Sequence, residues 1–309
     1  MGRESACNAR PVRARLPRWR GMTRSSTDHE LGQFIPLHYH FNMLNDVART
    51  GAFEEAIACT VKPGARVLEL GGGTGVVSFF AARGAEHVWC VERNPEVVRE
   101  CRRLLALNGC ADIVEVVEAD AFDFVPPEPL DVVVCEMLHV TLLVEKQLPV
   151  IAAFKEHYLA AHGPPLPRFL PEAVLQAVQP LQQSFEFHGY LAPTVHFQDG
   201  TAEQPRTREL GDPVVYQTLE LADAIPERIV WTGALVVTRP GSLNAVRFIT
   251  KNVLAILPAE GRSVDWLMNY LIVPLQTAIE VSAGDSVEVA FDYAFGGPLN
   301  SLRPTARLI

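Results

Sequence analysis

The fold is decided by one stretch of the chain, Val67-Leu68-Glu69-Leu70-Gly71-Gly72-Gly73-Thr74-Gly75-Val76-Val77. Its first four residues are apolar except for Glu69, which is typical of a buried strand that carries one acid. Glycines follow at positions 71, 73 and 75, and glycine lets a backbone turn sharply and approach a ligand because it has no Cβ. The stretch therefore predicts a strand, a ligand-binding turn and the start of a helix, which is a unit of α/β proteins.

The spacing of these glycines excludes two common nucleotide-binding loops. A dinucleotide fingerprint needs glycine at position 76, where this chain has Val76, and a P-loop needs a Gly-Lys-Ser/Thr run that does not follow. The pattern acid-x-Gly-x-Gly-x-Gly instead resembles the first motif of class I methyltransferases, whose loop holds the amino-acid part of S-adenosylmethionine. The resemblance implies that Glu69, Gly71, Gly73 and Gly75 bind this cofactor.

Short β-branched runs alternate with helical stretches along the chain from Lys62 to Leu170. In order, the segments are Arg66–Leu70, Gly75–Ala82, His87–Glu92, Pro95–Asn108, Ile113–Glu118, Leu130–Cys135 and Leu142–Leu159. Strands that alternate with helices pair in parallel through right-handed crossovers. We therefore predict a doubly wound α/β sheet, and the resemblance implies a Rossmann-like sheet of seven strands. A further helix is predicted from His40 to Ile57.

The pattern changes after the proline-rich stretch at residues 163–167. Strand-like segments then follow one another: Ala173–Val178, Val214–Leu221, Ile229–Val237, Ala245–Ile256, Leu271–Val281 and Ser286–Phe295. Such segments, separated by turns at Gly and Pro, predict an antiparallel sheet closed as a barrel or a sandwich. The predicted domains are a disordered basic tail (1–30), a cofactor-binding domain with a helical lead-in (31–170) and a β-barrel-like substrate domain (171–309).

Two more acids are predicted to hold the cofactor because of their positions after strands. Glu92 ends the predicted strand that follows the loop, and a carboxylate at the tip of the next parallel strand can accept both ribose hydroxyls. Asp120 follows the third predicted strand, where class I methyltransferases usually contact the adenine amino group. An aspartate in such a loop is also a common turn or cap residue.

A pair of glutamates follows the fourth predicted strand. Glu136 comes directly after the run Asp131-Val132-Val133-Val134-Cys135, and Glu145 follows nine residues later across a mostly apolar stretch. Open α/β sheets bind substrates at the carboxyl ends of their strands. Burying two carboxylates together is costly unless a cation bridges them. A guanidinium can bond both carboxylates and stays charged at physiological pH, so we infer a guanidine-containing substrate.

The glutamate pair resembles the paired glutamates of the protein arginine methyltransferase family, which have the same separation after the fourth strand. The lead-in agrees, because His40 to Thr50 is similar to that family's H-x-x-M-L-x-D-x-x-R-T helix. The resemblance implies that Arg49 clamps the cofactor carboxylate and that His40 lies against the cofactor. It also implies that the two glutamates are catalytic, that Asp46 lies at the substrate site, and that the protein forms a homodimer.

Some positions depart from the family pattern. The family's Thr-His-Trp loop appears here as Val264-Asp265-Trp266, so a second carboxylate replaces the histidine that would pair with Asp46. Two such acids either share a proton or hold a cation. We place Asp265 and Trp266 at the substrate site, where Asp265 would meet the α-ammonium group of a free amino acid. The region from Gly189 to Pro213, where the family inserts its dimerisation arm, is short and hydrophilic.

The bulk composition is that of an ordinary globular protein. The 309 residues are 48% hydrophobic and 20% charged, and no apolar run reaches the roughly 20 residues that a membrane-spanning helix needs. The six cysteines lack CxxC spacing, so the sequence suggests no zinc site, no disulfide and no secretion. We expect a cytoplasmic protein without a metal.

Charge is distributed unevenly along the chain. Residues 1–24 contain seven arginines and one acid, although the whole chain has a net charge of −9. An arginine-rich arm occurs in transit peptides and in segments that bind nucleic acid or membranes. We favour a disordered tail, or an upstream start before Met22, over these interpretations. Because the acidic remainder repels phosphate groups and favours cationic substrates, we predict neither a nucleic-acid partner nor a membrane partner.

The combined prediction is an S-adenosylmethionine-dependent N-methyltransferase for an arginine guanidino group, either of free L-arginine or of a peptide or protein. Two alternatives stay open. One is a class I methyltransferase for another small-molecule amine or hydroxyl, and the other is a catalytically silent S-adenosylmethionine-binding protein. A nucleic-acid methyltransferase is disfavoured because the body is acidic and no Asn/Asp-Pro-Pro-Tyr/Phe motif follows the fourth strand.

Overall fold

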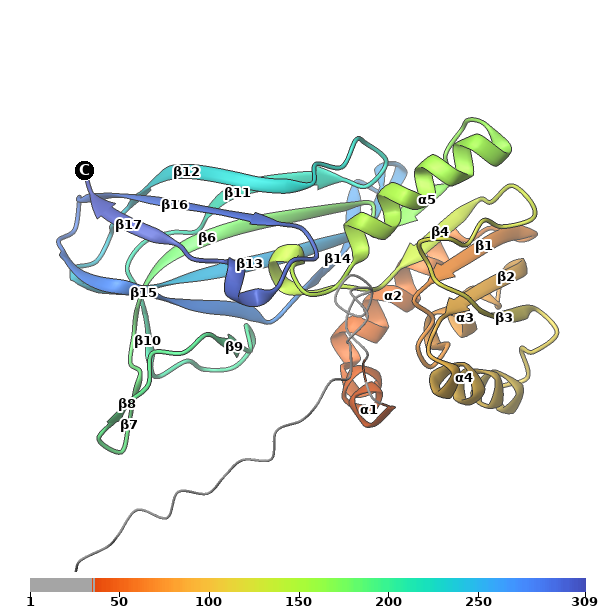
Figure 1. The fold of residues 1–309 in the computed structure, drawn as a ribbon, viewed down its shortest axis with the longest axis horizontal. Coiled ribbons are helices and arrows are strands. Elements are labelled where there is room, and N and C mark those ends of the chain that lie inside the picture. Colours follow the sequence, from red (N-terminus) through yellow and green to blue (C-terminus); the bar gives the residue numbers. More distant parts are fainter. Residues whose placement is uncertain (1–34, 36) are drawn as a thin grey trace, which may run out of the picture. The chain divides into compact units, whose positions relative to one another are not determined.

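The protein is described from a computed structural model, which places residue 35 and residues 37–309. The basic tail predicted for residues 1–30 lies outside these described residues. Figure 1 shows a parallel sheet with its helices and a second region of long antiparallel strands. Within the described part of the chain, no helix is long and apolar enough to cross a membrane.

The lead-in forms two helices where one was predicted from His40 to Ile57. They are α1 (Leu37–Asn45) and α2 (Val47–Thr60). Asp46 separates them because it caps α2, and its Oδ1 accepts a hydrogen bond from the backbone N–H of Arg49 at 3.0 Å. An aspartate at this position satisfies a donor that the first turn of a helix leaves without an intrahelical partner.

The predicted Rossmann-like sheet is confirmed as a parallel sheet in the order β3-β2-β1-β4-β5. Its strands are β1 (Ala65–Leu70), β2 (Ala85–Glu92), β3 (Val114–Glu118), β4 (Val132–Cys135) and β5 (Arg168–Leu170). The strand order reverses beside β1, and open α/β sheets bind their ligands at such a point. The described residues form five strands in this sheet, whereas seven were expected. The difference arises because the chain leaves the sheet after β5 and enters the antiparallel region at Ala173.

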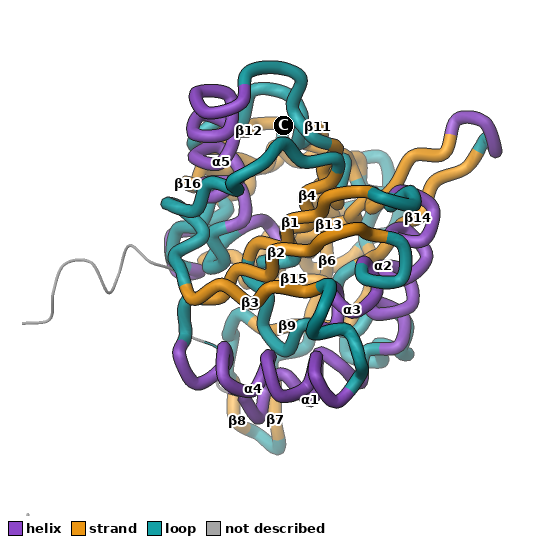
Figure 2. The backbone as a smooth tube through the Cα atoms, turned by 90° about the vertical axis from the view of Figure 1, so that its right-hand side faces the viewer, coloured by secondary structure: helices purple, strands orange, loops and turns teal. Residues whose placement is uncertain are grey.

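Helices cover both faces of the parallel sheet (Figure 2). They are α3 (Val76–Ala81), α4 (Pro95–Leu107) and α5 (Gln147–His162), together with α2. Side chains of α2, α3 and α4 share one apolar cluster, whereas those of α5 pack in another. Helix α5 starts later than the predicted Leu142, because Thr141, Leu142 and Val144 have φ angles of 65°, 58° and 66°. A right-handed helix cannot contain such residues.

The predicted antiparallel region is confirmed. One sheet contains β6 (Ala173–Gln183), β9 (His196–Gln198), β10 (Thr207–Glu209), β11 (Val214–Glu220), β13 (Gly241–Leu257), β14 (Arg262–Leu267) and β15 (Tyr270–Val281). A second contains β12 (Arg228–Val236), β16 (Ser286–Ala294) and β17 (Thr305–Leu308), and a hairpin consists of β7 (Glu186–Phe187) and β8 (Tyr190–Leu191). Short 3₁₀ turns in the described chain are η2 (Val140–Leu142), η3 (Pro258–Glu260) and η4 (Leu299–Ser301).

An aromatic core joins the two larger antiparallel sheets. Phe291 on β16 packs edge-on against Tyr216 on β11 and Phe248 on β13, with ring centroids 5.0 Å apart in both pairs. The hydroxyls of Tyr216 and Tyr293 share a hydrogen bond at 2.9 Å. Because a buried hydroxyl is costly without a partner, this bond lets two tyrosines occupy the apolar interior.

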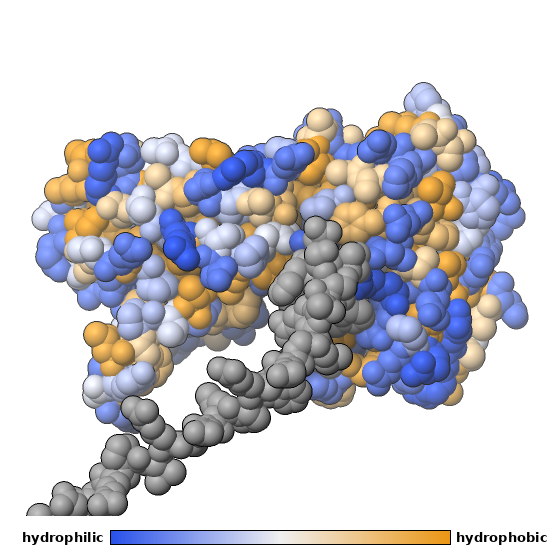
Figure 3. All heavy atoms as spheres, viewed as in Figure 1, coloured by the Kyte–Doolittle hydropathy of each residue, from blue (hydrophilic) through white to orange (hydrophobic). Residues whose placement is uncertain are grey.

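The segment between β6 and β11 forms an arm that carries the β7–β8 hairpin (Figure 1). We predicted a hydrophilic segment here, but Tyr190 and Leu191 are 72% and 69% exposed and Phe197 is also exposed. Figure 3 shows hydrophobic residues on the arm among hydrophilic ones. The segment is hydrophilic on average, and its exposed apolar side chains are concentrated at the hairpin and at β9.

A buried arginine on β13 anchors this arm. The guanidinium of Arg247 donates to Gln198 on β9 at 2.8 Å and to Glu209 on β10 at 2.7 Å. A third hydrogen bond joins it to Gln179 on β6 at 2.9 Å. A buried guanidinium is stable only when its donors find acceptors, so the arginine and the two strands β9 and β10 of the arm depend on each other.

We expect Arg247→Met to lower the free energy of unfolding by about 2–3 kcal/mol, because removing one partner leaves buried amides and a carboxylate unpaired. Urea denaturation measures the change. The matched control is Arg228→Met, because Arg228 pairs with Asp292 where both side chains are more than half exposed; this change should cost less than about 1 kcal/mol. Equal losses in the two variants would contradict the anchoring role.

Candidate functional site

The glycine loop follows β1 at the carboxyl end of the sheet. Gly71, Gly73 and Gly75 have φ angles of 81°, 53° and 80°, in a region that residues with a Cβ rarely adopt. A Cβ on Gly71 would lie 2.6 Å from Cγ of Met137, and one on Gly75 would lie 2.8 Å from Sγ of Cys101. Glycine is therefore required at these two positions by backbone conformation and by packing.

Glu92 ends β2 beside this loop. Its Oε2 accepts the backbone N–H of Gly73 at 3.1 Å, and its Oε1 accepts the backbone N–H of Asn94 at 2.8 Å. A carboxylate offers about four lone-pair directions in all, so each oxygen keeps the capacity to accept another donor. The position of Glu92 is therefore suited to accept two neighbouring hydroxyls, as the sequence predicted for a ribose.

Glu69 lies beneath the loop and is buried. Its Oε2 accepts hydrogen bonds from the backbone N–H of Ser78 at 3.0 Å and from the Ser78 hydroxyl, and Sγ of Cys90 lies 3.6 Å away. Burial raises the pKa of Glu69 to about 8, although the donors of Ser78 and Cys90 oppose the shift. These contacts fix the loop to α3, and a direct part for Glu69 in cofactor binding stays a prediction.

Asp120 lies just after β3, at the same end of the sheet as Glu92. Its Oδ1 accepts the backbone N–H of Phe122 at 3.0 Å, and its Oδ2 lies 3.3 Å from Nη1 of Arg93. The side chain therefore shapes the turn, as the alternative interpretation of the sequence expected. Its carboxylate is still partly exposed, which leaves the predicted contact with an adenine amino group open.

The lead-in helices bring two side chains to the loop and to the glutamates. His40 on α1 lies against the loop, since a Cβ on Gly73 would be 3.1 Å from His40 Cε1. Burial lowers the pKa of His40, and the neighbouring Glu92 opposes this shift. Arg49 on α2 donates from Nη2 to Oε2 of Glu136 at 2.6 Å, and the two side chains are only 11% and 14% exposed.

The two glutamates occupy desolvated positions after β4. Burial raises the pKa of Glu136, and the charge and hydrogen bond of Arg49 oppose this. Burial raises the pKa of Glu145 to about 7, and repulsion from Glu136 adds to the effect. The charge of Glu136 therefore acts on Glu145, which places the two carboxylates in the same region after β4. Among the described residues, the Glu145 carboxylate has no hydrogen-bonding or ion-pairing partner, unlike Glu136.

The segment between the two glutamates has a strained backbone. Thr141, Leu142 and Val144 all have positive φ angles, and each non-glycine residue in this region costs about 1–3 kcal/mol. Two of the three are β-branched, for which the left-handed region is especially unfavourable. Such a conformation persists only when surrounding contacts impose it. Sequence reasoning missed it because no glycine marks the turn.

Asp46 and Asp265 do not form the acid pair considered from the sequence. Asp46 caps α2. Asp265 on β14 pairs instead with Nζ of Lys251 on β13 at 2.5 Å, and the side chains are 25% and 45% exposed. The Oδ1 of Asp265 is buried without a hydrogen-bond partner in the described chain. The cation expected beside Asp265 is therefore Lys251, which sequence reasoning missed because only the register of β13 and β14 brings the two together.

Trp266 packs in the same apolar cluster as Leu138, which lies between the two glutamates. This cluster also contains side chains of α2. Trp266 therefore belongs to the apolar core on the side of the sheet that the lead-in covers. Its contacts are those of a packed side chain, and its role toward a substrate stays a prediction.

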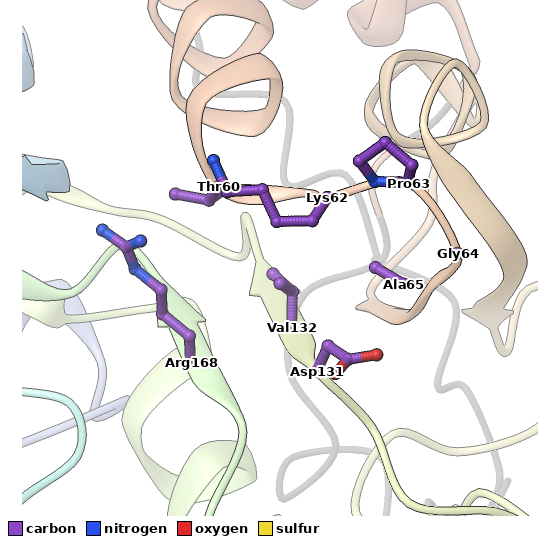
Figure 4. Close-up of a pocket in the computed structure, with 8 residues that line it drawn as sticks. All are labelled: Thr60, Lys62, Pro63, Gly64, Ala65, Asp131, Val132 and Arg168. Carbon is purple, nitrogen blue, oxygen red and sulfur yellow. The ribbon is translucent and has the colours of Figure 1, made fainter.

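A surface pocket lies at the other end of the parallel sheet (Figure 4). Its volume is about 200 Å³, and its lining residues are Thr60, Lys62, Pro63, Gly64, Ala65, Asp131, Val132 and Arg168. These residues include the first residues of β1, β4 and β5, whereas the glycine loop, Glu92 and Asp120 lie at the carboxyl ends of strands. The pocket is therefore separate from the candidate site. No cluster of potential metal ligands occurs among the residues that the structure describes.

Comparisons with known proteins agree with this arrangement. A family model described as a methyltransferase domain matches residues 67–158, which contain the glycine loop and both glutamates. An uncharacterised protein of Methanothermobacter thermautotrophicus is 31% identical over 265 residues, covering 85% of this chain and 95% of that protein. The arginine N(omega)-methyltransferase of Streptomyces achromogenes is 34% identical over 134 residues, covering 42% of this chain and 37% of that enzyme.

A solved structure shares the fold. The Trypanosoma brucei PRMT1 enzyme-prozyme heterotetrameric complex with AdoHcy contains a chain that superposes with a TM-score of 0.69 at 14% sequence identity. The match covers 88% of this chain and 97% of that one. The similarity therefore includes both the parallel sheet and the antiparallel region.

We expect Glu69→Gln to flatten the pH dependence of stability between pH 5 and pH 8. With a pKa of about 8 in the folded protein and an ordinary value of 4.5, the folded state holds one more proton than the unfolded state between these values. Stability contributed by Glu69 is therefore lost as pH rises, by about 3–5 kcal/mol in total. Urea denaturation at several pH values measures this loss. The exposed control Glu156→Gln should keep the wild-type slope, and an unchanged slope in Glu69→Gln would refute the elevated pKa.

Proposed function

We propose that this chain, a member of the protein arginine methyltransferase-like class I S-adenosylmethionine-dependent methyltransferases, methylates a guanidino nitrogen of arginine. The observation that carries the proposal is the desolvated pair Glu136 and Glu145. Glu136 already binds one guanidinium, that of Arg49. Glu145 presents a partly buried carboxylate with no partner in the described chain, and a desolvated carboxylate without a partner favours the binding of a cation.

The residues at the carboxyl end of the sheet fit S-adenosylmethionine, which supplies a methyl group on a sulfonium when bound. We assign the backbone of the glycine loop to its amino-acid part, since positive φ angles and the absence of Cβ atoms allow close approach. Glu92 accepts hydrogen bonds from the ribose hydroxyls, and Asp120 accepts a hydrogen bond from the adenine amino group. Arg49 binds the cofactor carboxylate, and His40 lies beside the loop.

The two carboxylates act on the nucleophile. A guanidinium has an ordinary pKa above about 12 and delocalises its lone pairs, so its nitrogens are poor nucleophiles. Glu136 and Glu145 draw positive charge toward the nitrogens that they contact and leave the remaining nitrogen richer in electrons. They would also hold that nitrogen in a fixed position and orientation, and positioning of this kind supplies a large part of many rate enhancements. As the nitrogen gains the methyl group and the donor is left as S-adenosylhomocysteine, Glu145 would accept the proton that the methylated nitrogen loses.

Free L-arginine is favoured as the form of the substrate by Lys251 and Asp265. The pair offers an ammonium and a carboxylate side by side, which complements the α-carboxylate and α-ammonium groups of an amino acid. In this proposal residues 31–170 bind the cofactor, and residues 171–309 form a β-barrel-like domain that contributes to the substrate site.

A homodimer and a cytoplasmic location complete the proposal. The exposed side chains of Tyr190 and Leu191 on the arm support self-association, because exposed apolar side chains are often buried against a partner. The acidic net charge of −9 argues against nucleic acid and anionic membranes as partners.

We expect Glu136→Gln and Glu145→Gln each to lower kcat by about a thousandfold, because each removes a charge that acts on the reacting guanidinium. Transfer of a labelled methyl group to L-arginine and to arginine peptides measures turnover, and isothermal titration calorimetry measures cofactor binding. Cofactor affinity should change less than threefold for Glu145→Gln. The control Glu156→Gln should keep full activity. Turnover retained in both active-site variants would contradict the assignment.

We expect Lys251→Met and Asp265→Asn each to raise KM for free L-arginine at least tenfold while leaving kcat within threefold. Each substitution removes a charge-assisted hydrogen bond worth about 1.5–3 kcal/mol. Intact-mass analysis of the products identifies the methylated acceptor. Saturable turnover of peptides alone would rule out free arginine, and methylation of only a non-guanidino acceptor would rule out the guanidine.

A further inference from the structure

The loop that carries Glu145 is held in place by the antiparallel region. We propose that Thr250 on β13 and the turn Gly296–Gly297 after β16 are positioning residues for Glu145, although neither touches the substrate. The expected effects on kcat rest on the proposed function. The fixed position of Glu145 and its raised pKa rest on the geometry of the loop.

The first contact is a hydrogen bond to the strained backbone. The N–H of Thr141 donates to Oγ1 of Thr250 at 2.9 Å, and both residues are fully buried. Thr141 has a φ of 65°, which lies in the left-handed region. Its amide therefore has a different direction from the one it would have at the negative φ angles that threonine usually adopts. Without the Thr250 hydroxyl, this amide would be buried with no acceptor, and the strained conformation would lose the contact that compensates it.

The second set of contacts comes from the turn after β16. Val144 donates its N–H to the carbonyl of Gly297 at 2.8 Å, and Gly296 donates its N–H to the carbonyl of Leu142 at 2.9 Å. The Nζ of Lys146 donates to the carbonyl of Gly296 at 2.7 Å. Residues immediately before and after Glu145 are therefore bonded to one turn.

Gly296 approaches the Glu145 backbone more closely than a larger residue would allow. A Cβ built on Gly296 would lie 3.3 Å from the carbonyl oxygen of Glu145 and 2.8 Å from Cδ of Lys146. Its φ of 65° is also unfavourable for residues with a side chain. Glycine at this position lets the turn pack directly against the catalytic segment.

A further bond closes the segment on the side of the sheet. Nε2 of Gln147, the first residue of α5, donates to the carbonyl of Cys135 at 3.0 Å. Cys135 directly precedes Glu136, so this bond links the ends of the segment that contains both glutamates. Thr250 and the Gly296–Gly297 turn hold the middle of the segment and the residues around Glu145. The backbone that carries the Glu145 side chain is therefore held by hydrogen bonds to residues before and after it.

The consequence of this fixation is a desolvated carboxylate with a defined direction. Glu136, which follows β4, is the charged group that raises the pKa of Glu145. Arg49 and Asp46 from the lead-in act on Glu136. Lys146 lies next to Glu145 in the chain, and its ammonium is bonded to the turn. A loosened segment admits water to Glu145. Its pKa then falls from about 7 toward the ordinary 4.5, and the carboxylate no longer keeps the alignment that the reaction requires.

Thr250→Val tests the inference because valine keeps the shape of threonine and removes the acceptor. We expect kcat to fall at least tenfold with KM and cofactor affinity within threefold, and the acid limb of the pH–kcat profile to move below pH 7 by at least half a unit. Thr250→Ser keeps the hydroxyl and should restore both quantities. Gly296→Ala should show the same direction of change as Thr250→Val.

Thr60→Val is the matched control. It also removes a buried hydroxyl, which donates to the carbonyl of Ala56 at 2.7 Å within α2, and it should leave kcat and the acid limb unchanged. An acid limb that stays at its wild-type position in both Thr250→Val and Gly296→Ala overturns the inference. So does a kcat in Thr250→Ser as low as that in Thr250→Val.

A readout without turnover separates this inference from the proposed function. In protein labelled with ¹³C at the glutamate carboxyl groups, NMR titration follows the pKa of Glu145, identified by the resonance missing in Glu145→Gln. A lower pKa in Thr250→Val, with the wild-type value in Thr250→Ser and Thr60→Val, supports the positioning role even if no guanidine is methylated. An unchanged pKa in Thr250→Val and Gly296→Ala overturns it.

Discussion

The desolvation of two carboxylates after β4 is the constraint on which the rest of the site depends. Burial raises the pKa of both Glu136 and Glu145, so each is held in a surrounding that disfavours its charged form unless a cation is near. Arg49 meets this need for Glu136, while Glu145 has no such partner in the part of the chain that the structure places. The site is thus asymmetric, with one carboxylate neutralised and the other available for a ligand.

Holding a carboxylate in this state requires support from outside the parallel sheet. The segment between the glutamates has unfavourable φ angles at Thr141, Leu142 and Val144, and its backbone bonds run to β13 and to the turn after β16. The parallel sheet alone supplies the strand ends and the glycine loop. The antiparallel region supplies the contacts that make the loop rigid, so both regions contribute to one site.

The parts of the fold that follow from local patterns were predictable. The glycine loop, the strands that end at Glu92 and before Glu136, and the change to antiparallel strands all leave a periodic or spacing signal in the sequence. The break at Asp46 has a local signal that the prediction did not use, since an aspartate often caps the helix that follows it. The late start of α5 and the pairing of Lys251 with Asp265 leave no such signal. Each of these depends on a contact between residues whose proximity is set by tertiary packing or strand register, and no local pattern contains that information.

Arg49 links the two halves of the proposed reaction through one side chain. Its guanidinium has five N–H donors in a planar fork, and a single Nη2 bond to Glu136 is present in the structure, so donors remain for the carboxylate of the cofactor. A cofactor carboxylate on the same guanidinium would share its positive charge with Glu136. Glu136 would then be less neutralised and would bind a substrate guanidinium more strongly. Because coupling between two ligands is reciprocal, a bound arginine would strengthen cofactor binding by the same factor, and Arg49 would be the residue through which the two sites communicate.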